Sequence, residues 1–258
     1  MKKVVLITVM SFIFCVSNAQ LKNDLIKLKT LKNDTTKAKI LGNIGYDYGI
    51  QNPDSAMYYY NESKKLAARL NYYTGIIKTN TNIGELYRQM GNFDQSLKSD
   101  RINLKLAEKH GNQVEKANCY SNISNSFHYL LKFDSCSKYD LKAQKIYESL
   151  ADKNPLVVFY NNIATSYAER HLFEKSLEFN FKSLKLYEQG FGEKKDFSYI
   201  LASISATYLY INQNEKAFLY AQKAIKAARS EKNYYMQFVI LGNTLLIKLN
   251  QKKYEDLF

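Results

Sequence analysis

A motif that returns about every forty residues constrains the fold of this 258-residue chain more than any other feature of its sequence. An isoleucine occurs at positions 44, 83, 123, 163 and 204, so successive copies lie 39, 40, 40 and 41 residues apart. The residue after each isoleucine is small: Gly45, Gly84, Ser124, Ala164 and Ser205. The residue four positions after it is aromatic: Tyr48, Tyr87, Phe127, Tyr167 and Tyr208. A fixed period of this length is typical of chains that stack one supersecondary unit many times.

Each copy of the motif predicts a pair of helices. An isoleucine, its neighbour and the residue four positions on share one helical face, and ten glycines and two prolines are few interruptions. Every unit then carries a second small residue, at which a partner helix can approach closely: Ala56, Ser96, Cys136, Ser176 and Ala217. One hairpin cannot bury its apolar face alone, whereas stacked hairpins can. The predicted fold class is all-α, an α-α superhelix of helical hairpins.

The second unit carries the most specific form of the motif. It reads isoleucine, small residue, two variable residues and an aromatic, then Gly-Asn-Phe and another small residue, from Ile83 to Ser96. This order resembles the tetratricopeptide repeat (TPR), and the resemblance covers roughly residues 37–258. The chain departs from the family pattern in having no tryptophan. A spacing near forty is similar to the longer repeats of kinesin light chains and of bacterial peptide-responsive regulators, which implies binding of a protein or peptide in a concave groove.

The array is expected to span residues 34–258, behind a leading amphipathic helix at 20–33. Asp34 is expected to be the N-cap that opens the first repeat. The expected repeats are 37–71, 77–112, 115–151, 156–190 and 197–231, followed by a partial repeat at 234–258. The partial repeat would leave Leu249, Tyr254 and Phe258 exposed, which predicts self-association through this end or fraying of it.

Residues 1–19 have the features of a secretory signal peptide. Met1-Lys2-Lys3 is positively charged, residues 4–16 carry no charge, and small residues follow up to Ala19. The uncharged run is short for a membrane span, which needs about 20 residues. Cleavage after Ala19 would export the chain, most simply to the periplasm, with no stable membrane insertion of the mature segment. The alternative is a lipoprotein anchor at Cys15, although Phe14 stands where lipoprotein processing requires a small residue.

Four asparagines form the strongest candidate binding site. Asn43, Asn82, Asn122 and Asn162 directly precede the recurring isoleucines, and the fifth unit has Ser203 instead. One residue back is about 100° around a helix, so each amide lies at the edge of the packed face, and stacking would align all four along an inner groove. An asparagine side chain has two donors and one acceptor, so the row can bind the backbone of an extended peptide. The same helical face adds Arg88 and Tyr129 as candidates.

Two alternative roles for the asparagines remain open. The amides could bond to adjacent helices, or they could recur only because the repeats were duplicated. The role in peptide-backbone binding is also what the resemblance to kinesin-light-chain-like repeats implies. The groove lacks the dense Lys/Arg cluster that would hold a terminal carboxylate, so an internal, extended segment is the expected ligand.

The sequence predicts no enzyme and no cofactor or metal site. A catalytic or metal centre requires ionisable or ligating groups brought together, but His110, His128 and His171 fall at different levels of different hairpins. Cys119 and Cys136 could pair after export, although Cys136 occupies a small packing position and is expected to be a buried thiol.

The net charge of +13 is interpreted as dispersed rather than as a nucleic-acid signal. Lysines occur on both helices of every repeat, whereas a nucleic-acid surface concentrates them with stacking aromatics. Weak attraction to anionic envelope surfaces remains an alternative.

The expected function is therefore an exported, non-catalytic scaffold that binds a protein or peptide segment. The alternative is the sensory region of a longer signalling protein. The export signal and the Asn-Pro-Asp-Ser-Ala turn at 52–56 resemble Bacteroidetes proteins in which such an array precedes a histidine kinase or a helix-turn-helix domain. On that view the unfinished last repeat would continue into a further domain.

Overall fold

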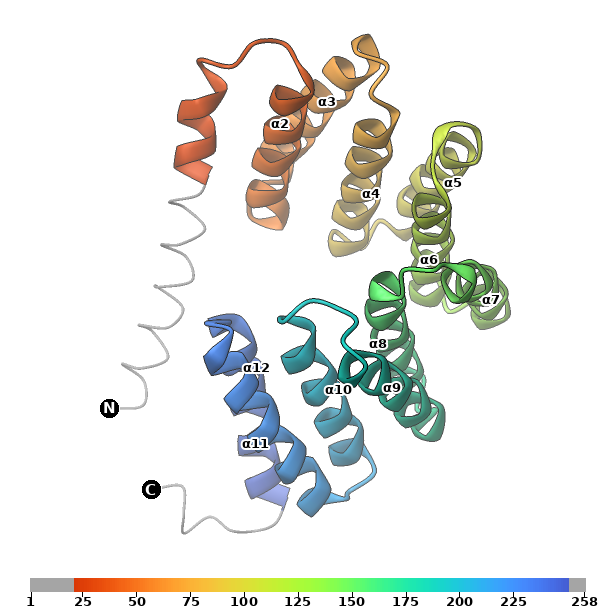
Figure 1. Ribbon diagram of the computed structural model, residues 1–258, viewed down its shortest axis with the longest axis vertical. Coiled ribbons are helices and arrows are strands. Elements are labelled where there is room, and N and C mark those ends of the chain that lie inside the picture. Colours follow the sequence, from red (N-terminus) through yellow and green to blue (C-terminus); the bar gives the residue numbers. More distant parts are fainter. Residues whose placement is uncertain (1–20, 251–258) are drawn as a thin grey trace. The chain divides into compact units, whose positions relative to one another are not determined.

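A computed structural model describes residues 21–250, and this part of the chain is all-α, without a strand. Residues 21–28 form a short helix. Helical hairpins follow, each with a first and a second helix (Figure 1). The first helices are α2 (Thr35–Tyr48), α4 (Tyr73–Gln89), α6 (Gln113–Tyr129), α8 (Asn154–Glu169), α10 (Asp196–Tyr210) and α12 (Tyr234–Asn250). The second helices are α3 (Pro53–Arg69), α5 (Phe93–His110), α7 (Phe133–Ser149), α9 (Phe173–Glu188) and α11 (Asn214–Ser230).

The described residues divide into two compact units. The N-terminal unit ends at Tyr147 and holds α2 to α6 and nearly all of α7, and the C-terminal unit begins at Glu148 and holds α8 to α12. Within each unit, a first helix contacts its own second helix and also the first helix of the next hairpin, as α2 contacts α4 and α8 contacts α10. Each unit therefore stacks its hairpins in the way that the repeat predicts.

The recurring motif forms the interior of the hairpins. All five isoleucines are buried, and Ile44, Ile123 and Ile204 have no exposed surface. The small residues that follow them allow close helix contact, because a Cβ on Gly84 would lie 2.5 Å from Asp100 Oδ1 on α5. A Cβ on Gly45 would similarly lie 2.6 Å from the Tyr60 ring. Both positions therefore need a residue no larger than glycine as long as these neighbours keep their places.

Caps and left-handed turns lie at the ends of the helices. Asp34 caps α2, since its carboxylate accepts a hydrogen bond from the Lys37 backbone N–H at 3.0 Å. Gly91 follows α4 with a φ of 74°, the left-handed conformation that ends many helices. Equivalent turns place Leu131, His171 and Asn212 in this conformation, with φ between 56° and 59°. The repeat thus imposes one backbone turn on quite different side chains.

The two cysteines of the third hairpin are free, buried thiols. Cys136 Sγ lies 3.1 Å from Ser124 Oγ, as expected for a residue packed between the helices of one hairpin. Burial raises the pKa of Cys119 to about 12, with smaller contributions from nearby acidic groups. Both side chains therefore serve packing in this structure rather than a disulfide.

Some expectations concern segments outside the described residues. The proposed signal peptide, the side chain of Leu249, and the residues from 251 onward, including Tyr254 and Phe258, belong to this group. Of the leading helix expected at 20–33, residues 21–28 are helical, and Leu28 packs against Ala38 and Leu41. None of the described helices has the length and apolar character that a membrane span requires.

Candidate peptide-binding surface

The four predicted asparagines lie on the first helices with their side chains at least partly open to solvent. Asn43 and Asn162 are exposed, whereas Asn82 and Asn122 are half-buried. Their side chains make no hydrogen bond to any other described residue. These amides therefore do not join adjacent helices in this structure.

Buried asparagines of the N-terminal unit have side chains that hydrogen-bond to neighbouring helices. Asn103, on α5, is 1% exposed, and its Nδ2 donates to the Ile77 carbonyl and to Thr81 Oγ1, both at 3.1 Å. Its Oδ1 accepts from Asn80 Nδ2 at 3.4 Å. The side chains of the motif asparagines make no such hydrogen bonds, and of their amide groups Nδ2 of Asn122 is buried.

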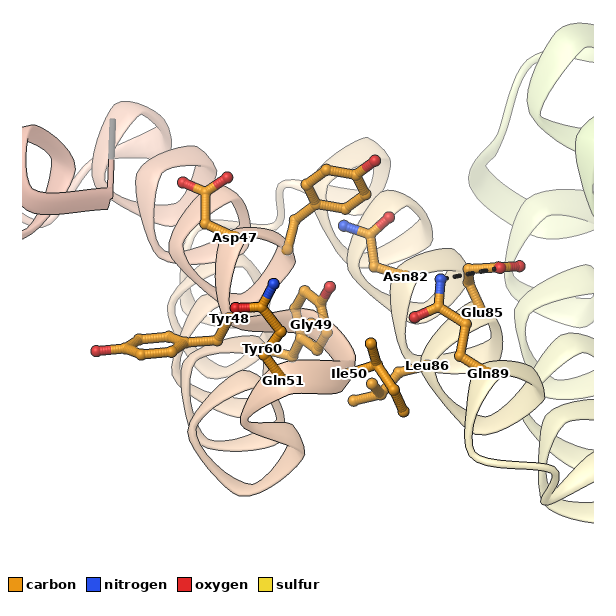
Figure 2. Close-up of a pocket in the computed structure, with 11 residues that line it drawn as sticks. Asp47, Tyr48, Gly49, Ile50, Gln51, Tyr60, Asn82, Glu85, Leu86 and Gln89 are labelled. Carbon is orange, nitrogen blue, oxygen red and sulfur yellow. Dashed lines mark hydrogen bonds between the residues drawn. The ribbon is translucent and has the colours of Figure 1, made fainter. Parts of the chain in front are cut away.

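A cavity of about 240 Å³, here called the N-terminal pocket, lies beside Asn82. Its lining comes from the end of α2, the single 3-10 turn Gly49–Gln51, α3 and α4 (Figure 2). Tyr46, Asp47, Gln51, Tyr60, Asn82 and Glu85 supply most of its polar groups. Asn82 and Asn43 also line a smaller adjoining cavity with Lys39 and Lys78. Two of the predicted asparagines therefore lie along one continuous stretch of the α2 and α4 surfaces.

The C-terminal unit contains a comparable cavity of about 300 Å³, here called the C-terminal pocket. Residues of α8, α10 and α12 line it, among them Tyr199, Tyr210 and Tyr235. Its amides come from Asn161 and Asn243, and Asn161 Oδ1 is shielded from solvent without a hydrogen-bond partner. The predicted Asn162 is exposed but does not line this cavity.

Asn243 lines the C-terminal pocket. It belongs to the recurring asparagine series, although it was not predicted from the sequence. It lies forty residues after Ser203, and Leu241-Gly242-Asn243-Thr244 repeats the order Leu41-Gly42-Asn43-Ile44. The sixth copy of the motif is harder to recognise in the sequence because it has threonine in place of the isoleucine. Asn161 could not be found in this way, because only packing decides which of two neighbouring amides turns toward the cavity.

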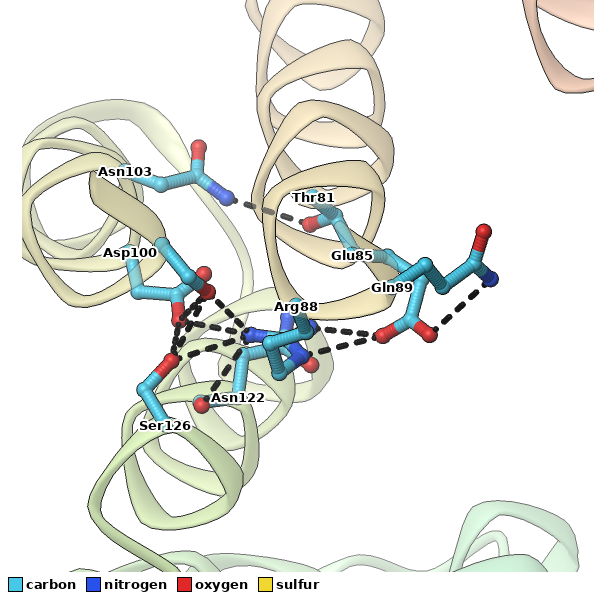
Figure 3. A network of polar contacts seen from close by, with 9 residues as sticks. Thr81, Glu85, Arg88, Gln89, Asp100, Asn103, Asn122 and Ser126 are labelled. Carbon is cyan, nitrogen blue, oxygen red and sulfur yellow. Dashed lines mark hydrogen bonds and ion pairs between the residues drawn. The ribbon is translucent and has the colours of Figure 1, made fainter. Parts of the chain in front are cut away.

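Arg88 occupies a different environment from the one expected. It is 6% exposed, and its Nη1 donates to Asp100 Oδ2 at 2.8 Å and to Ser126 Oγ at 3.1 Å (Figure 3). Its Nε donates to Glu85 Oε2 at 3.0 Å. The guanidinium is therefore fully used in joining α4, α5 and α6, and we leave Arg88 out of the peptide-contacting set.

Asp100 is the buried partner in this cluster, and its side chain has no exposed surface. Burial raises the pKa of its carboxyl, and this outweighs the opposing effects of Arg88 and of the hydrogen bond from Ser126. Asn122 borders the same cluster, because its carbonyl accepts from Arg88 Nη1 at 3.5 Å, while its Nδ2 is buried without a partner.

Tyr129 lies at the end of α6 with 48% of its surface exposed. Its ring stacks on Phe93, with centroids 5.1 Å apart and an interplanar angle of 6°. The equivalent pair Phe173 and Tyr210 stacks in the C-terminal unit, with centroids 5.7 Å apart. Tyr210 is 62% exposed and lines the C-terminal pocket together with Asn161.

The titratable residues of the described chain are spread among separate elements. Its His, Cys, Asp and Glu residues form no group of three or more that could hold a metal ion. His110 stacks on Tyr73, with centroids 3.7 Å apart, and His128 and His171 lie beside Phe133 and Phe173. These histidines act as aromatic surfaces between helices.

Comparisons of the fold place the chain among TPR-like repeat proteins. A Rap protein complexed with Competence and Sporulation Factor matches with a TM-score of 0.63 and 14% identity, over 90% of this chain and 70% of that one. A putative kinesin light chain from Podosopora anserina with TPR-like repeats gives 0.55 and 9%, over 77% and 98%. The signal transduction ATPase PH0952 from Pyrococcus horikoshii, which has a tetratricopeptide repeat sensor, gives 0.56 and 16%, over 91% and 38%.

No protein-family model and no curated protein sequence matches the chain. At 9 to 16% identity these structural likenesses establish the fold and nothing further. The chain thus has a TPR-like helical-repeat fold.

Proposed function

We propose that this protein is a non-catalytic scaffold that binds an extended peptide or protein segment along its first helices. The observation that carries the proposal is the set of asparagines without hydrogen-bond partners beside the two pockets. In a solved TPR-like neighbour, the Rap protein is complexed with Competence and Sporulation Factor, so the fold is compatible with a bound partner.

The chemistry of the amides suits a peptide backbone. Each asparagine can donate to a backbone carbonyl and accept from a backbone N–H. Asn82 in the N-terminal pocket and Asn161 and Asn243 in the C-terminal pocket offer this pair of groups next to exposed tyrosines. Backbone contacts set position and orientation, and the pockets select side chains.

A triple substitution tests the proposal. Extended peptides selected from a random library on the purified protein should bind Asn82→Ala/Asn161→Ala/Asn243→Ala at least about tenfold more weakly, because each lost hydrogen bond costs about 1 kcal/mol. A matched control replaces exposed amides of second helices by Ala: Asn61, Gln95 and Gln222. Equal affinity of both triple variants, measured by fluorescence anisotropy, would rule out the asparagine surface.

We further propose that residues 1–19 direct export to the periplasm, with cleavage after Ala19. The charged start and uncharged run of this segment support the proposal. N-terminal sequencing of protein from fractionated cells should begin at Gln20. An uncleaved Met1 in the cytoplasmic fraction would contradict it.

A second candidate function is that of the sensory region of a larger signalling protein. It is favoured by the fold similarity to PH0952, in which a tetratricopeptide repeat sensor belongs to a much longer chain. The coding sequence after Phe258 decides between the two: a continuing membrane helix with a kinase or helix-turn-helix domain favours the sensor, and an intergenic region favours the scaffold.

A further inference from the structure

The N-terminal pocket has a charge opposite to that of the whole protein. The chain carries 37 Lys and Arg residues against 24 Asp and Glu. The lining of this pocket nevertheless contains Asp47 and Glu85 and no Lys or Arg. A local excess of negative charge in a basic protein indicates a specific electrostatic preference of this cavity.

Arg88 offsets this excess only in part, and Lys39 and Lys78 line the adjoining cavity rather than this one. Arg88 is the cation next to Glu85, at 2.9 Å, but the same guanidinium also pairs with Asp100 at 2.8 Å. One positive charge is thus divided between two carboxylates. A further carboxylate, the buried Asp24, repels Asp47.

Asp47 is a carboxylate of this lining to which no described residue donates a hydrogen bond. Its Oδ2 is shielded from solvent and accepts no hydrogen bond. Burial, and after it the charge of Asp24, raises the pKa of the Asp47 carboxyl. A cation close to this carboxyl would stabilise its charged form.

Tyrosines and amides supply the other walls. The Tyr60 side chain, 2% exposed, lies among the labelled lining residues (Figure 2). Tyr46 also lines the pocket and has 68% of its surface exposed. The pKa of Tyr60 is raised by burial and by Tyr46, Asp47 and Glu85, which places its hydroxyl within the field of these groups. Aromatic faces, a carboxylate and the side-chain carbonyls of Gln51 and Asn82 are the groups that a planar guanidinium contacts best.

We propose that the N-terminal pocket binds an arginine side chain of the extended segment, with Asp47 as its carboxylate partner and Tyr46 as a stacking surface. This inference rests on the proposed function, since the arginine belongs to the peptide that the first helices hold. Long-range repulsion by the basic chain is screened within about 8 Å at physiological salt, so the local charge of the pocket determines this preference.

A small probe tests the pocket apart from the peptide. Nα-acetyl-L-arginine N-methylamide is titrated into the ¹⁵N-labelled protein, and the backbone amide signals of Gly49, Gln51 and Gln89 are followed by NMR. The citrulline analogue is the control, because it has nearly the same shape without the charge. Saturable shifts with arginine and at least about tenfold weaker binding of citrulline are expected. Equal binding of both probes, or shifts spread over the whole molecule, would overturn the inference.

Two substitutions test which side chains of the pocket bind the arginine probe. Asp47→Asn should weaken the arginine probe about tenfold and leave citrulline unchanged, whereas the matched change Asp54→Asn, at an exposed site on α3, should change neither. Tyr46→Ala removes an exposed side chain without touching the interior and should weaken the arginine probe severalfold. Wild-type affinity in both Asp47→Asn and Tyr46→Ala would overturn the assignment.

The two proposals fail differently. If library peptides bind and depend on the asparagines but arginine and citrulline probes bind alike, the arginine site is wrong and the scaffold function stands. If the arginine probe binds through Asp47 but selected peptides ignore the asparagines, the proposed backbone-binding surface is wrong.

Discussion

At the scale of single residues, the repeat places polar side chains at interior positions and gives partners to only some of them. Asn103 is fully hydrogen-bonded within the N-terminal unit. Asn180 on α9 is equally buried, at 0% exposure, yet neither its Nδ2 nor its Oδ1 has a partner among the described residues. An unsatisfied buried amide costs about 1–3 kcal/mol.

Leucine substitutions at these two positions should therefore have opposite effects. Asn180→Leu is expected to raise the free energy of unfolding by about 1–2 kcal/mol, because it removes an unsatisfied group and adds apolar surface. Asn103→Leu is expected to lower it by about 1–3 kcal/mol, because Asn80 loses its acceptor. Urea denaturation followed by circular dichroism measures both. Destabilisation by Asn180→Leu as large as that by Asn103→Leu would contradict this interpretation.

At the scale of elements, the helices of the N-terminal unit are held by a polar cluster as well as by apolar packing. Arg88 of α4 reaches Asp100 of α5 and Ser126 of α6, and Ser96 Oγ lies 2.9 Å from Ser126 Oγ. Buried pairs of this kind stabilise little in themselves, but the loss of one partner leaves a buried charge.

Removal of the arginine alone should be severe, and removal of both charges should be milder. Arg88→Met is expected to lower the free energy of unfolding by about 3–5 kcal/mol, because Asp100 is left uncompensated. Arg88→Met/Asp100→Leu should recover most of this loss. A double variant as unstable as Arg88→Met, in thermal and urea unfolding, would show that shape rather than charge dominates here.

At the scale of the whole molecule, the positive charge has a structural use on the second helices. Lys142 lies over the rings of Tyr120 and Tyr139, both at 5.2 Å, and Lys223 lies over Tyr220 at the same distance. Long lysine stems cover aromatic surface in this way while their charged ends remain in water. Such lysines occur in both units, in line with the interpretation that the charge is dispersed over the repeats.

Weak and unspecific contact with nucleic acids is the expected consequence. Fluorescence anisotropy with a DNA of about 20 base pairs at about 150 mM salt should show no saturation up to about 10 µM protein, because dispersed lysines neutralise few phosphates at once. A saturable complex below about 1 µM would contradict the dispersed-charge interpretation. A random-coil polylysine of similar charge provides the positive control.

Comparison of particular residues shows how far the sequence could be interpreted. The isoleucines and small residues predict the helical hairpins, because helix periodicity and close packing are local properties that recur with each copy. The asparagine row predicts which helices carry the candidate surface. The sequence could not predict the environment of individual polar side chains, as Arg88, Asn161 and Asn162 show. A shift of one residue around a helix exchanges a more buried position for a more exposed one.

The sequence by itself determined the class of fold, the hairpin unit and the helices that carry the motif asparagines. Only the tertiary structure decided that Arg88 is buried against Asp100, that Asn161 rather than Asn162 lines the C-terminal pocket, and that Asp47 Oδ2 remains without a hydrogen bond beside Tyr60. The physical reason is that periodicity reports the face of one helix, whereas cavities and charge pairs depend on side chains from several helices that meet only after stacking.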